Sequence, residues 1–360
     1  MIKRLLFLSL FFIVNLCYAQ IPSKSDNSLD PYLNNHNEWF QTKEANRIAE
    51  NILLWQRITG GWPKNEDMTV TVDPVLEKTL KEDHSRVDDS TIDNKATVIQ
   101  LRFLANYLVS NKQYDKKFLH SFLRGLDYLF EAQYPHGGWP QFYPFHYKPF
   151  FREITFNDNA MTNVMELLLS LQDERYSSIV GEYSQKINIS FNKGLDLILK
   201  LQIVQNGVLT GWCQQYDFKT LKPTDARIYE VPSIASLETA GILKFLMKIK
   251  NPSPEIKKSI EGGVKWLQQS RIDGYKLVVQ RDEADLVIDR YIVASPTSEK
   301  LWARFYEISS NRPIFIGRDG IVKHSIQEIE RERRAGYEFY IHGLESTYEK
   351  EYPLWKKNNP

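Results

Sequence analysis

Cysteine is nearly absent from this chain of 360 residues, which holds only Cys17 and Cys213. Two cysteines form one bridge at most, so a disulfide-dense scaffold is excluded. Net charge is nearly absent as well, at +1 with histidine neutral. Without a basic field the surface cannot hold a nucleic acid through its phosphates, and we expect no nucleic-acid partner.

Long apolar runs are also scarce. The chain has one, Leu5–Val14, which follows two basic residues and precedes the small residue Ala19. The run is shorter than the about 20 residues that a membrane span needs, so residues 1–19 are predicted to be a secretory signal peptide. Cleavage near Ala19 would remove Cys17 and both basic residues. That leaves 44 basic against 45 acidic residues, a charge of −1, and Cys213 without a disulfide partner.

The rest of the chain divides into a polar arm at residues 20–40 and one predicted domain at residues 41–360. The hydrophobic content of 42% is ordinary for a globular protein. The aromatic content of 13% is high, and it indicates either a large core or faces on which ligands stack. No second run of membrane-spanning length follows. We therefore expect a secreted or periplasmic protein that is a monomer and has no membrane partner.

A glycine turn that carries a tryptophan recurs along the domain, each time after a helix-like segment. Successive turns are 77 and 73 residues apart, counted between Gly61, Gly138 and Gly211. The three tryptophans are Trp62, Trp139 and Trp212, and a fainter fourth copy is predicted at Gly274–Tyr275. Further amphipathic helices are predicted between the turns, at residues 96–108, 160–171 and 234–249.

A unit of helix, polar loop, helix and glycine-tryptophan turn thus repeats about three times. Alternating inner and outer helices of this kind close into an α/α barrel or toroid, so we predict an all-α fold. Few strands are expected, the best at residues 276–280 and 286–293, and a further helix is predicted at residues 301–308. A linear helical solenoid is the competing architecture, but its period of about 34 residues is half of the period found here.

Two acidic clusters stand at the starts of predicted inner helices, Asp93-Asn94 in one and Asn157-Asp158-Asn159 in the next. In a toroid these helix starts open at one end of the central cleft, so the two clusters are expected to face one another. Carboxylate and amide oxygens suit a hard cation such as Ca²⁺, whereas no His/Cys cluster has zinc spacing. The alternative is that Asp93 and Asp158 only cap the helices that follow them.

The corresponding polar loop of the third unit offers an arginine instead of an aspartate. Arg227 lies between Asp225 and Glu230. The alternative to a functional role is a surface salt bridge with one of these two carboxylates.

Two more arginines, Arg312 and Arg318, lie in the glycine-containing stretch 311–320. Guanidinium groups suit carboxylate ligands because they form two parallel hydrogen bonds. The alternative is a structural turn in which Asp319 holds Arg318.

Six ordered motifs resemble those of the family 10 polysaccharide lyases, which are secreted, calcium-dependent pectate lyases. Together they cover roughly residues 45–345. They are Gly-Gly-Trp-Pro-Lys-Asn at 60–65, Thr-Ile-Asp-Asn at 91–94, Gly-Gly-Trp-Pro-Gln-Phe at 137–142, Phe-Asn-Asp-Asn-Ala-Met at 156–161, Asp-Ala-Arg-Ile-Tyr-Glu at 225–230, and Asn-Arg-Pro at 311–313 with Gly-Arg-Asp-Gly at 317–320. The glycine-tryptophan turn alone also resembles helical-toroid terpene cyclases, but their Asp-x-Asp-Asp motif is absent.

The resemblance implies a short α/α toroid that cleaves α-1,4-linked polygalacturonate by β-elimination with Ca²⁺ as cofactor. It gives Arg227 the role of Brønsted base and places Asp93, Asn94 and Asp158 at the calcium and substrate site. It also implies that Arg312 or Arg318 binds a substrate carboxylate.

An acidic polymer must be attracted locally, because the protein is near neutral overall. Lys64 and the three arginines are the candidates for this attraction. Trp139 is a candidate to stack on a sugar ring, together with Trp62 and Trp212. The alternative is that these tryptophans pack under the glycine turns as part of the core.

Elimination requires removal of the proton on C5, next to the uronate carboxylate. A Ca²⁺ that bridges this carboxylate to Asp93 and Asp158 would neutralise its charge and stabilise the enolate-like intermediate. Arginine has a pKa above about 12, so it serves as a base only when it is neutral part of the time. Activity is therefore expected to peak at alkaline pH, on the order of 8–10.

Two other function classes stay open at this point. A glycoside hydrolase on an α/α barrel would use paired carboxylates, namely Asp93 and Asp158, joined by Glu230 or Glu238. A non-catalytic glycan-binding protein would hold pectate without generating a product. The ultraviolet absorbance of an unsaturated product distinguishes the lyase from both.

Overall fold

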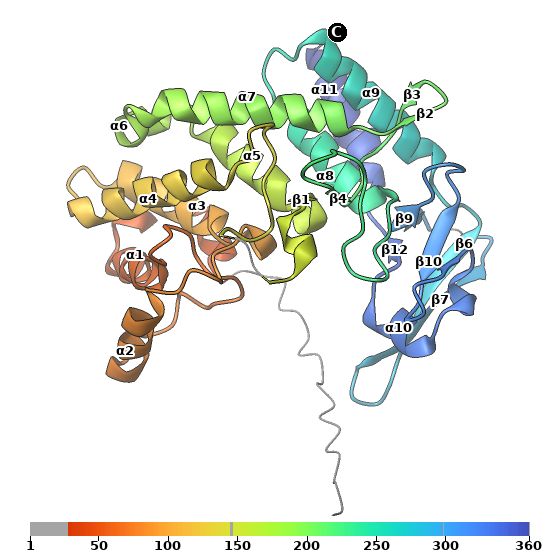
Figure 1. Cartoon of the computed structure of the whole chain (residues 1–360), viewed down its shortest axis with the longest axis horizontal. Helices are drawn as coiled ribbons and strands as arrows, with labels where there is room; N and C mark the ends of the chain where they lie inside the picture. The colour runs from red at the N-terminus through yellow and green to blue at the C-terminus, as the bar shows by residue number, and fades with distance from the viewer. Residues whose placement is uncertain (1–27, 145–146, 298, 360) are drawn as a thin grey trace, which may run out of the picture.

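The computed structural model describes residues 28–144, 147–297 and 299–359, and Figure 1 shows how their helices stack side by side. The predicted signal peptide at residues 1–19 and the first part of the predicted arm lie outside the described residues. Within them, no helix is long and apolar enough to cross a membrane.

Helices dominate the described part of the chain. Their bounds are α1 Lys43–Trp55, α2 Pro74–Asp83, α3 Val98–Ser110, α4 Lys116–Ala132, α5 Ala160–Ser170, α6 Ser177–Val180, α7 Tyr183–Leu201, α8 Ser236–Leu246, α9 Pro254–Gln269, α10 Arg331–Gly336 and α11 Tyr352–Asn358.

Three helix pairs build the body, α3 with α4, α5 with α7, and α8 with α9. The first member of each pair is buried on most of its sides. The second member buries one stripe and turns the rest to solvent, as an amphipathic helix does. Inner and outer helices therefore alternate, and the predicted all-α toroid is confirmed.

The strands are short. Their bounds are β1 Ile154–Thr155, β2 Val204–Gln205, β3 Val208–Leu209, β4 Gln215–Tyr216, β5 Ile234–Ala235, β6 Tyr275–Arg281, β7 Val287–Ala294, β8 Trp302–Ala303, β9 Phe305–Tyr306, β10 Pro313–Ile316, β11 Val322–Lys323 and β12 Tyr340–Ile341. The longest two, β6 and β7, form an antiparallel hairpin where strands were predicted. A four-stranded sheet runs in the order β11-β10-β9-β5. Because β5 takes the first two residues of the helix predicted at 234–249, α8 begins later than predicted.

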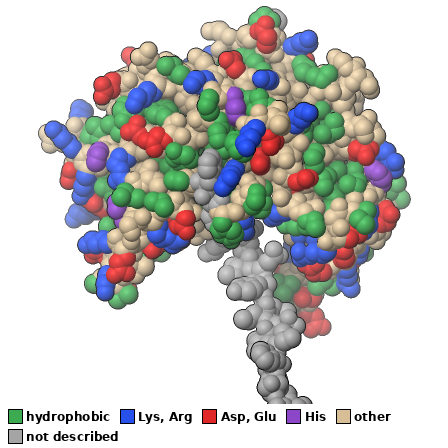
Figure 2. Space-filling view, viewed as in Figure 1, with side chains coloured by type: hydrophobic (Ala, Val, Ile, Leu, Met, Phe, Trp, Pro, Cys, Tyr) green, Lys and Arg blue, Asp and Glu red, His purple; other side chains and the backbone are tan. Residues whose placement is uncertain are grey.

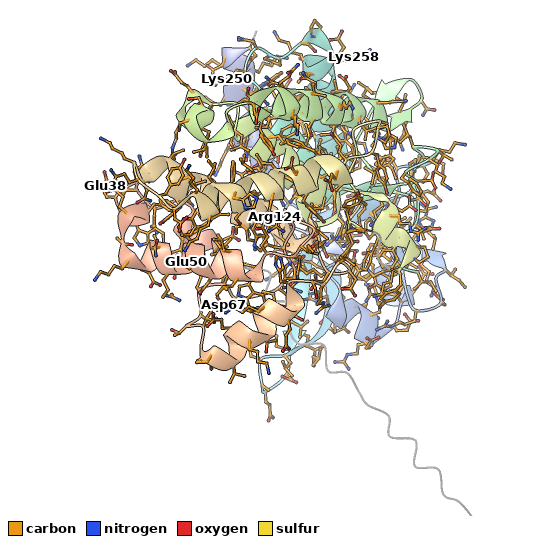
Figure 3. The ribbon with its side chains drawn as sticks, turned by 60° about the vertical axis from the view of Figure 1, so that its left-hand side comes forward. Glu38, Glu50, Asp67, Arg124, Lys250 and Lys258 are labelled. Carbon is orange, nitrogen blue, oxygen red and sulfur yellow. The ribbon has the colours of Figure 1, made fainter. Side chains whose placement is uncertain are left out.

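The first two glycine-tryptophan turns pack against the backbone of the next outer helix. Gly60 has a φ of 91° and Gly137 a φ of 107°. A Cβ at these positions would lie 2.3 Å from the carbonyl oxygen of Arg124 in α4 and 2.1 Å from that of Lys193 in α7. Only glycine adopts this φ without strain and allows so close a contact. Figure 3 shows Arg124 on α4, near the end of α1.

The tryptophan side chains of these turns are part of the core. Trp62, Trp139 and Trp212 are fully buried. Each indole N–H donates a hydrogen bond to a carbonyl of the preceding helix at 2.7–2.8 Å, and the acceptors are Ile52, Leu129 and Ile198. Core packing is therefore the correct alternative. The prediction that Trp139 contacts substrate is wrong, because a fully buried ring offers no face to a sugar.

The fourth turn carries Trp302 and is not at the predicted Gly274–Tyr275. Trp302 is fully buried, and its indole N–H donates to the carbonyl of Leu267 at 2.7 Å. The β6–β7 hairpin separates this tryptophan from α9, which is why its spacing in the sequence does not follow the repeat.

The prediction of a helix at residues 301–308 is wrong, because this segment forms β8 and β9. It repeats the local structure of residues 212–216. The hydroxyl of Tyr306 donates to a carbonyl and accepts a hydrogen bond from the Ala303 N–H. The hydroxyl of Tyr216 does the same with the Cys213 N–H.

The described part of the predicted arm packs against the domain. Leu29 and Phe40 are fully buried in the main core. Asp30 forms an ion pair of 2.7 Å with Lys95, which follows the first acidic cluster. The arm therefore reaches the polar loop that precedes α3.

The surface carries both signs of charge. Figure 2 shows Lys and Arg side chains interspersed with Asp and Glu over the visible face. Labelled charged residues also lie at opposite ends of the molecule, with Lys250 and Lys258 at one end and Asp67 at the other (Figure 3). No single sign of charge dominates this face, and the local attraction of an acidic ligand stays a prediction.

Candidate active site

A pocket of about 440 Å³ lies where the polar loops of the repeated units meet. It collects side chains from segments that are far apart in the sequence. Five predicted site residues line it, and they are Lys64, Asp93, Asn94, Asp158 and Arg227.

The two acidic clusters form tight 3₁₀ turns, Asp93–Lys95 and Asn157–Asn159, before the inner helices α3 and α5. Asn94 has a φ of 49° and Asp158 a φ of 52°. Asn and Asp tolerate this left-handed region better than other side chains do. Neither α3 nor α5 has a side-chain cap. The alternative that Asp93 and Asp158 only cap these helices is therefore wrong.

Asp93 is almost fully buried, with 3% of its surface exposed. Its Oδ2 forms a close ion pair with the ammonium group of Lys64. Its Oδ1 accepts a hydrogen bond from the Asn94 N–H at 3.1 Å. The Asn94 side chain donates to Asn65 Oδ1 at 2.9 Å. The first cluster is thus held by a cation that comes from the first glycine-tryptophan turn.

Asp158 lines the same pocket as this cluster. Asn157 Nδ2 donates to Asp158 Oδ2 at 2.6 Å. Burial raises the pKa of Asp158, and the negative charge of Asp93 acts in the same direction. A cation bound beside Asp158 would stabilise its charged form and offset the repulsion from Asp93.

The donor set around these carboxylates suits a hard cation. Gln141, Gln214 and Gln215 line the same pocket, and each has a buried Oε1 without a hydrogen-bond partner in the described structure. Free amide oxygens and carboxylates are ligands of Ca²⁺. The described residues contain no group of three or more His, Cys, Asp or Glu side chains that could hold a metal ion. Such a site would therefore combine two carboxylates with amide oxygens, water or substrate.

Arg227 forms a two-point ion pair with Glu230. Its Nε lies 2.7 Å from Glu230 Oε2, and its Nη2 contacts Oε1. Tyr337 donates to the same Oε1 at 3.2 Å. Glu230 is buried, whereas the Arg227 side chain is 45% exposed. The alternative of a salt bridge with Glu230 is thus half right, since the pair exists but lies in the pocket.

The pair shifts the pKa of both partners. Burial acts to lower the pKa of Arg227, but the hydrogen bond and charge of Glu230 outweigh it and raise this pKa above its usual value. Burial acts to raise the pKa of Glu230, but Arg227 outweighs it and lowers that pKa. In the described arrangement Arg227 is held in its charged form.

Arg312 and Arg318 do not line this pocket. Arg318 pairs with Glu332 at 2.7 Å, and Arg312 is exposed. The alternative in which Asp319 holds Arg318 is wrong, because Asp319 pairs with Lys323. A carboxylate role for either arginine therefore requires a substrate that extends beyond the pocket.

A buried ion pair next to the pocket was missed in the sequence. Arg304 Nη2 lies 3.1 Å from Glu238 Oε1, and both residues are buried. Burial acts to lower the pKa of Arg304, but the charges of Glu238 and Asp158 are among those that outweigh it and raise this pKa. Burial raises the pKa of Glu238. Arg304 thus adds positive charge to the region of Asp158.

The repeat contains a signal for most of these side chains. Each occupies the second position after a buried tryptophan of the repeat, and the four are Lys64, Gln141, Gln214 and Arg304. Three of them line the pocket, and Arg304 interacts with Asp158. The turn that buries the tryptophan therefore directs the side chain two positions later toward the site.

Comparisons with known proteins show which family the fold and sequence resemble. The family model for pectic acid lyase matches residues 56–345. Among solved structures, one similar chain is a family 10 polysaccharide lyase from Cellvibrio cellulosa, with 30% identity, a TM-score of 0.72, and coverage of 89% of this chain and 94% of that one. An Asp-to-Ala mutant of a family 10 polysaccharide lyase from the same organism, in complex with trigalaturonic acid, has 28% identity, a TM-score of 0.74, and coverage of 92% and 98%. No curated protein matches.

Proposed function

The chain belongs to the pectic acid lyase family and is a family 10 polysaccharide lyase, a pectate lyase, and from this premise we propose that it is secreted and cleaves polygalacturonate by calcium-assisted β-elimination. The proposal assigns Arg227 as the base. One observation carries it, namely that Asp93, Asp158 and Arg227 come from three separate loops and converge in one pocket.

The residues that would hold the cation are Asp93 and Asp158, with the free Oε1 atoms of Gln141, Gln214 and Gln215 nearby. When bound, Ca²⁺ would offset the charge of the substrate carboxylate and make the neighbouring C5 proton more acidic. Lys64 already supplies a positive charge to Asp93. Its ammonium group would turn to a substrate carboxylate when a cation occupies its place.

Arg227 would remove the C5 proton. The electron pair of the C5–H bond then forms the C4–C5 double bond, and the C4–O bond breaks. The leaving oxygen takes a proton, so the products are an unsaturated end and a new hydroxyl end. Because Glu230 holds Arg227 in its charged form, this role requires a substrate-bound arrangement in which Arg227 has released Glu230. It also requires alkaline pH, since the base must be neutral.

The substrate class follows from the similar structure that holds trigalaturonic acid. The test is incubation with polygalacturonate, with and without a chelator, followed by ultraviolet absorbance. An absorbance increase that the chelator abolishes supports the proposal. New reducing ends without absorbance would indicate a hydrolase, and binding without any product would indicate a glycan-binding protein. Secretion is tested separately by sequencing the N-terminus of the exported protein, which is expected to begin after Ala19.

A further inference from the structure

A second hollow lies between α3 and α5, where the arm crosses them. Two cavities of about 250 Å³ each share Leu33, Asn34 and Arg102 in their walls. The shared walls make them one groove, which we call the α3–α5 groove. It extends along α3 from Val98 to Asn106, which is about 12 Å at the rise of an α-helix.

The α3–α5 groove continues from the catalytic pocket. Lys95 lines both the pocket and the nearer of the two cavities. Its own charge is neutralised by Asp30 of the arm, at 2.7 Å. An acidic polysaccharide that leaves the pocket past Lys95 would therefore enter the groove without passing an unpaired carboxylate, because Lys95 neutralises Asp30.

Arg102 is the central charged group of the groove. Its Nη2 lies 3.8 Å from Glu166 Oε2, which is beyond hydrogen-bond distance. Glu166 instead binds Lys248 at 2.6 Å. Arg102 thus has a carboxylate nearby that another cation already holds, and its planar fork of donors is left for a ligand.

Arg175 lies at the other end of the groove. It is exposed, and its side chain donates to the amide oxygen of Asn37 at 2.9 Å. In the described part of the chain, neither Arg102 nor Arg175 donates a side-chain hydrogen bond to a carboxylate. The two guanidinium groups give the groove a surplus of positive charge.

Two further features suit a sugar rather than a bare anion. The Nδ2 of Asn163 is buried in the groove wall and has no hydrogen-bond partner in the described structure. A buried donor without a partner is costly, and a hydroxyl or ring oxygen of a ligand would satisfy it. Leu33, which is half-buried, gives the wall an apolar part that fits the C–H face of a pyranose.

We propose that the α3–α5 groove is a distal subsite for a galacturonate unit of the chain whose reacting bond lies in the catalytic pocket. Arg102 binds its carboxylate, Asn163 donates to a hydroxyl or ring oxygen, and Arg175 binds the next carboxylate along. This inference rests on the proposed function, because it assumes a polygalacturonate ligand. It predicts that affinity rises with chain length beyond the units that fill the pocket.

The test measures KM and kcat for a series from trigalacturonate to hexagalacturonate, with the wild type, Arg102→Gln, Arg102→Lys and Arg175→Gln. The ratio of the KM of Arg102→Gln to the wild-type KM is expected to be about ten for the longest chain and about one for the trimer, as for loss of one charge-assisted hydrogen bond. Arg102→Lys keeps the charge but loses the fork, so it should recover only part of the affinity. Arg281→Gln, in the distant β6–β7 hairpin, is the matched control.

Each outcome decides one question. If the ratio of the Arg102→Gln KM to the wild-type KM is the same for every chain length, the groove is not a subsite. If Arg102→Gln does not fold, the exposed Arg175→Gln carries the same test, with a smaller effect confined to the longest chains. If the wild type yields no unsaturated product from any chain length, the proposed function is wrong. Wild-type turnover of the trimer confirms that function independently of the groove.

Discussion

Glu230 accepts two side-chain hydrogen bonds from Arg227, and a third comes to it from the hydroxyl of Tyr337. The carboxylate is buried and its guanidinium partner is half-exposed. The side chain that we assign as the base is therefore held charged by its own neighbour. If Arg227 is the base, we expect this pair to set the pH at which it becomes active.

Glu230→Gln should shift the pH–rate profile toward lower pH. The charge and hydrogen bond of Glu230 raise the pKa of Arg227, so their removal lowers it. A lower pKa makes the neutral base available at lower pH, and the rising limb of kcat/KM against pH moves in the acid direction. The measurement is that profile for both proteins at saturating calcium. If the rising limb stays in place or moves to higher pH, Glu230 does not control the pKa of the catalytic base.

Arg227→Ala and Arg227→Lys should lower kcat by a factor of about 10²–10⁴, the usual contribution of a positioned base. Lysine keeps the charge but neither the length nor the fork of the side chain. Arg47→Ala removes a comparable exposed pair with Glu44 and serves as the control with unchanged kcat. Thermal denaturation shows whether each variant is folded. If either variant turns over substrate near the wild-type rate, Arg227 is not the catalytic base.

Lys64→Met should strengthen calcium binding in the absence of substrate. The ammonium group of Lys64 occupies Asp93 Oδ2, and a cation must displace it. Partly exposed ion pairs contribute about 0.2–1 kcal/mol, so the Kd should fall about 1.4- to fivefold. Isothermal titration calorimetry measures it, and Lys78→Met, on the surface of α2, is the control. A weaker affinity would mean that Lys64 helps to arrange the cation site.

Much of the site could be predicted because it follows the repeat. Asp93 and Asp158 occupy equivalent loops, and the toroid brings such loops together whatever their separation in the chain. The hydrophobic period and the glycine-tryptophan turns were sufficient to predict that topology, since both are local signals.

The remaining features depend on contacts that local patterns do not encode. Arg304 was missed because the β6–β7 hairpin moves Trp302 out of the repeat spacing, and because residues 301–308 were predicted to form a helix. The pairing of Arg318 with Glu332 instead of Asp319 depends on where α10 packs. The burial of Trp139 under its turn also depends on the outer helix that covers it.

Trp139→Ala should unfold more easily rather than bind substrate more weakly. The ring is fully buried and its N–H is bonded to Leu129, so its loss leaves a cavity and an unpaired carbonyl. Truncation of a buried tryptophan costs about 3–5 kcal/mol. Urea denaturation measures the loss, and KM is measured on the fraction that remains folded. A stable variant with a raised KM would return Trp139 to the substrate site.

Asp158→Asn should raise the melting temperature of the calcium-free protein at neutral pH. Burial raises the pKa of Asp158 in the folded state, so the folded protein binds this proton more tightly than the unfolded chain does. Folding stability therefore falls as the pH rises from the unfolded pKa through the folded one, and the cost remains at higher pH. Asparagine has no charge to bury and no such cost.

The same substitution should remove most of the stabilisation by calcium. A ligand that binds only the folded state adds about 2.7 kcal/mol at 100 times its Kd, and Asp158 is one of the two carboxylates that would bind it. Melting curves of both proteins are recorded with chelator and with calcium, at pH 5 and pH 8. The wild type should gain from calcium and the variant should not. Asp225→Asn, outside the pocket lining, should behave like the wild type. An equal gain in Asp158→Asn would place the cation elsewhere.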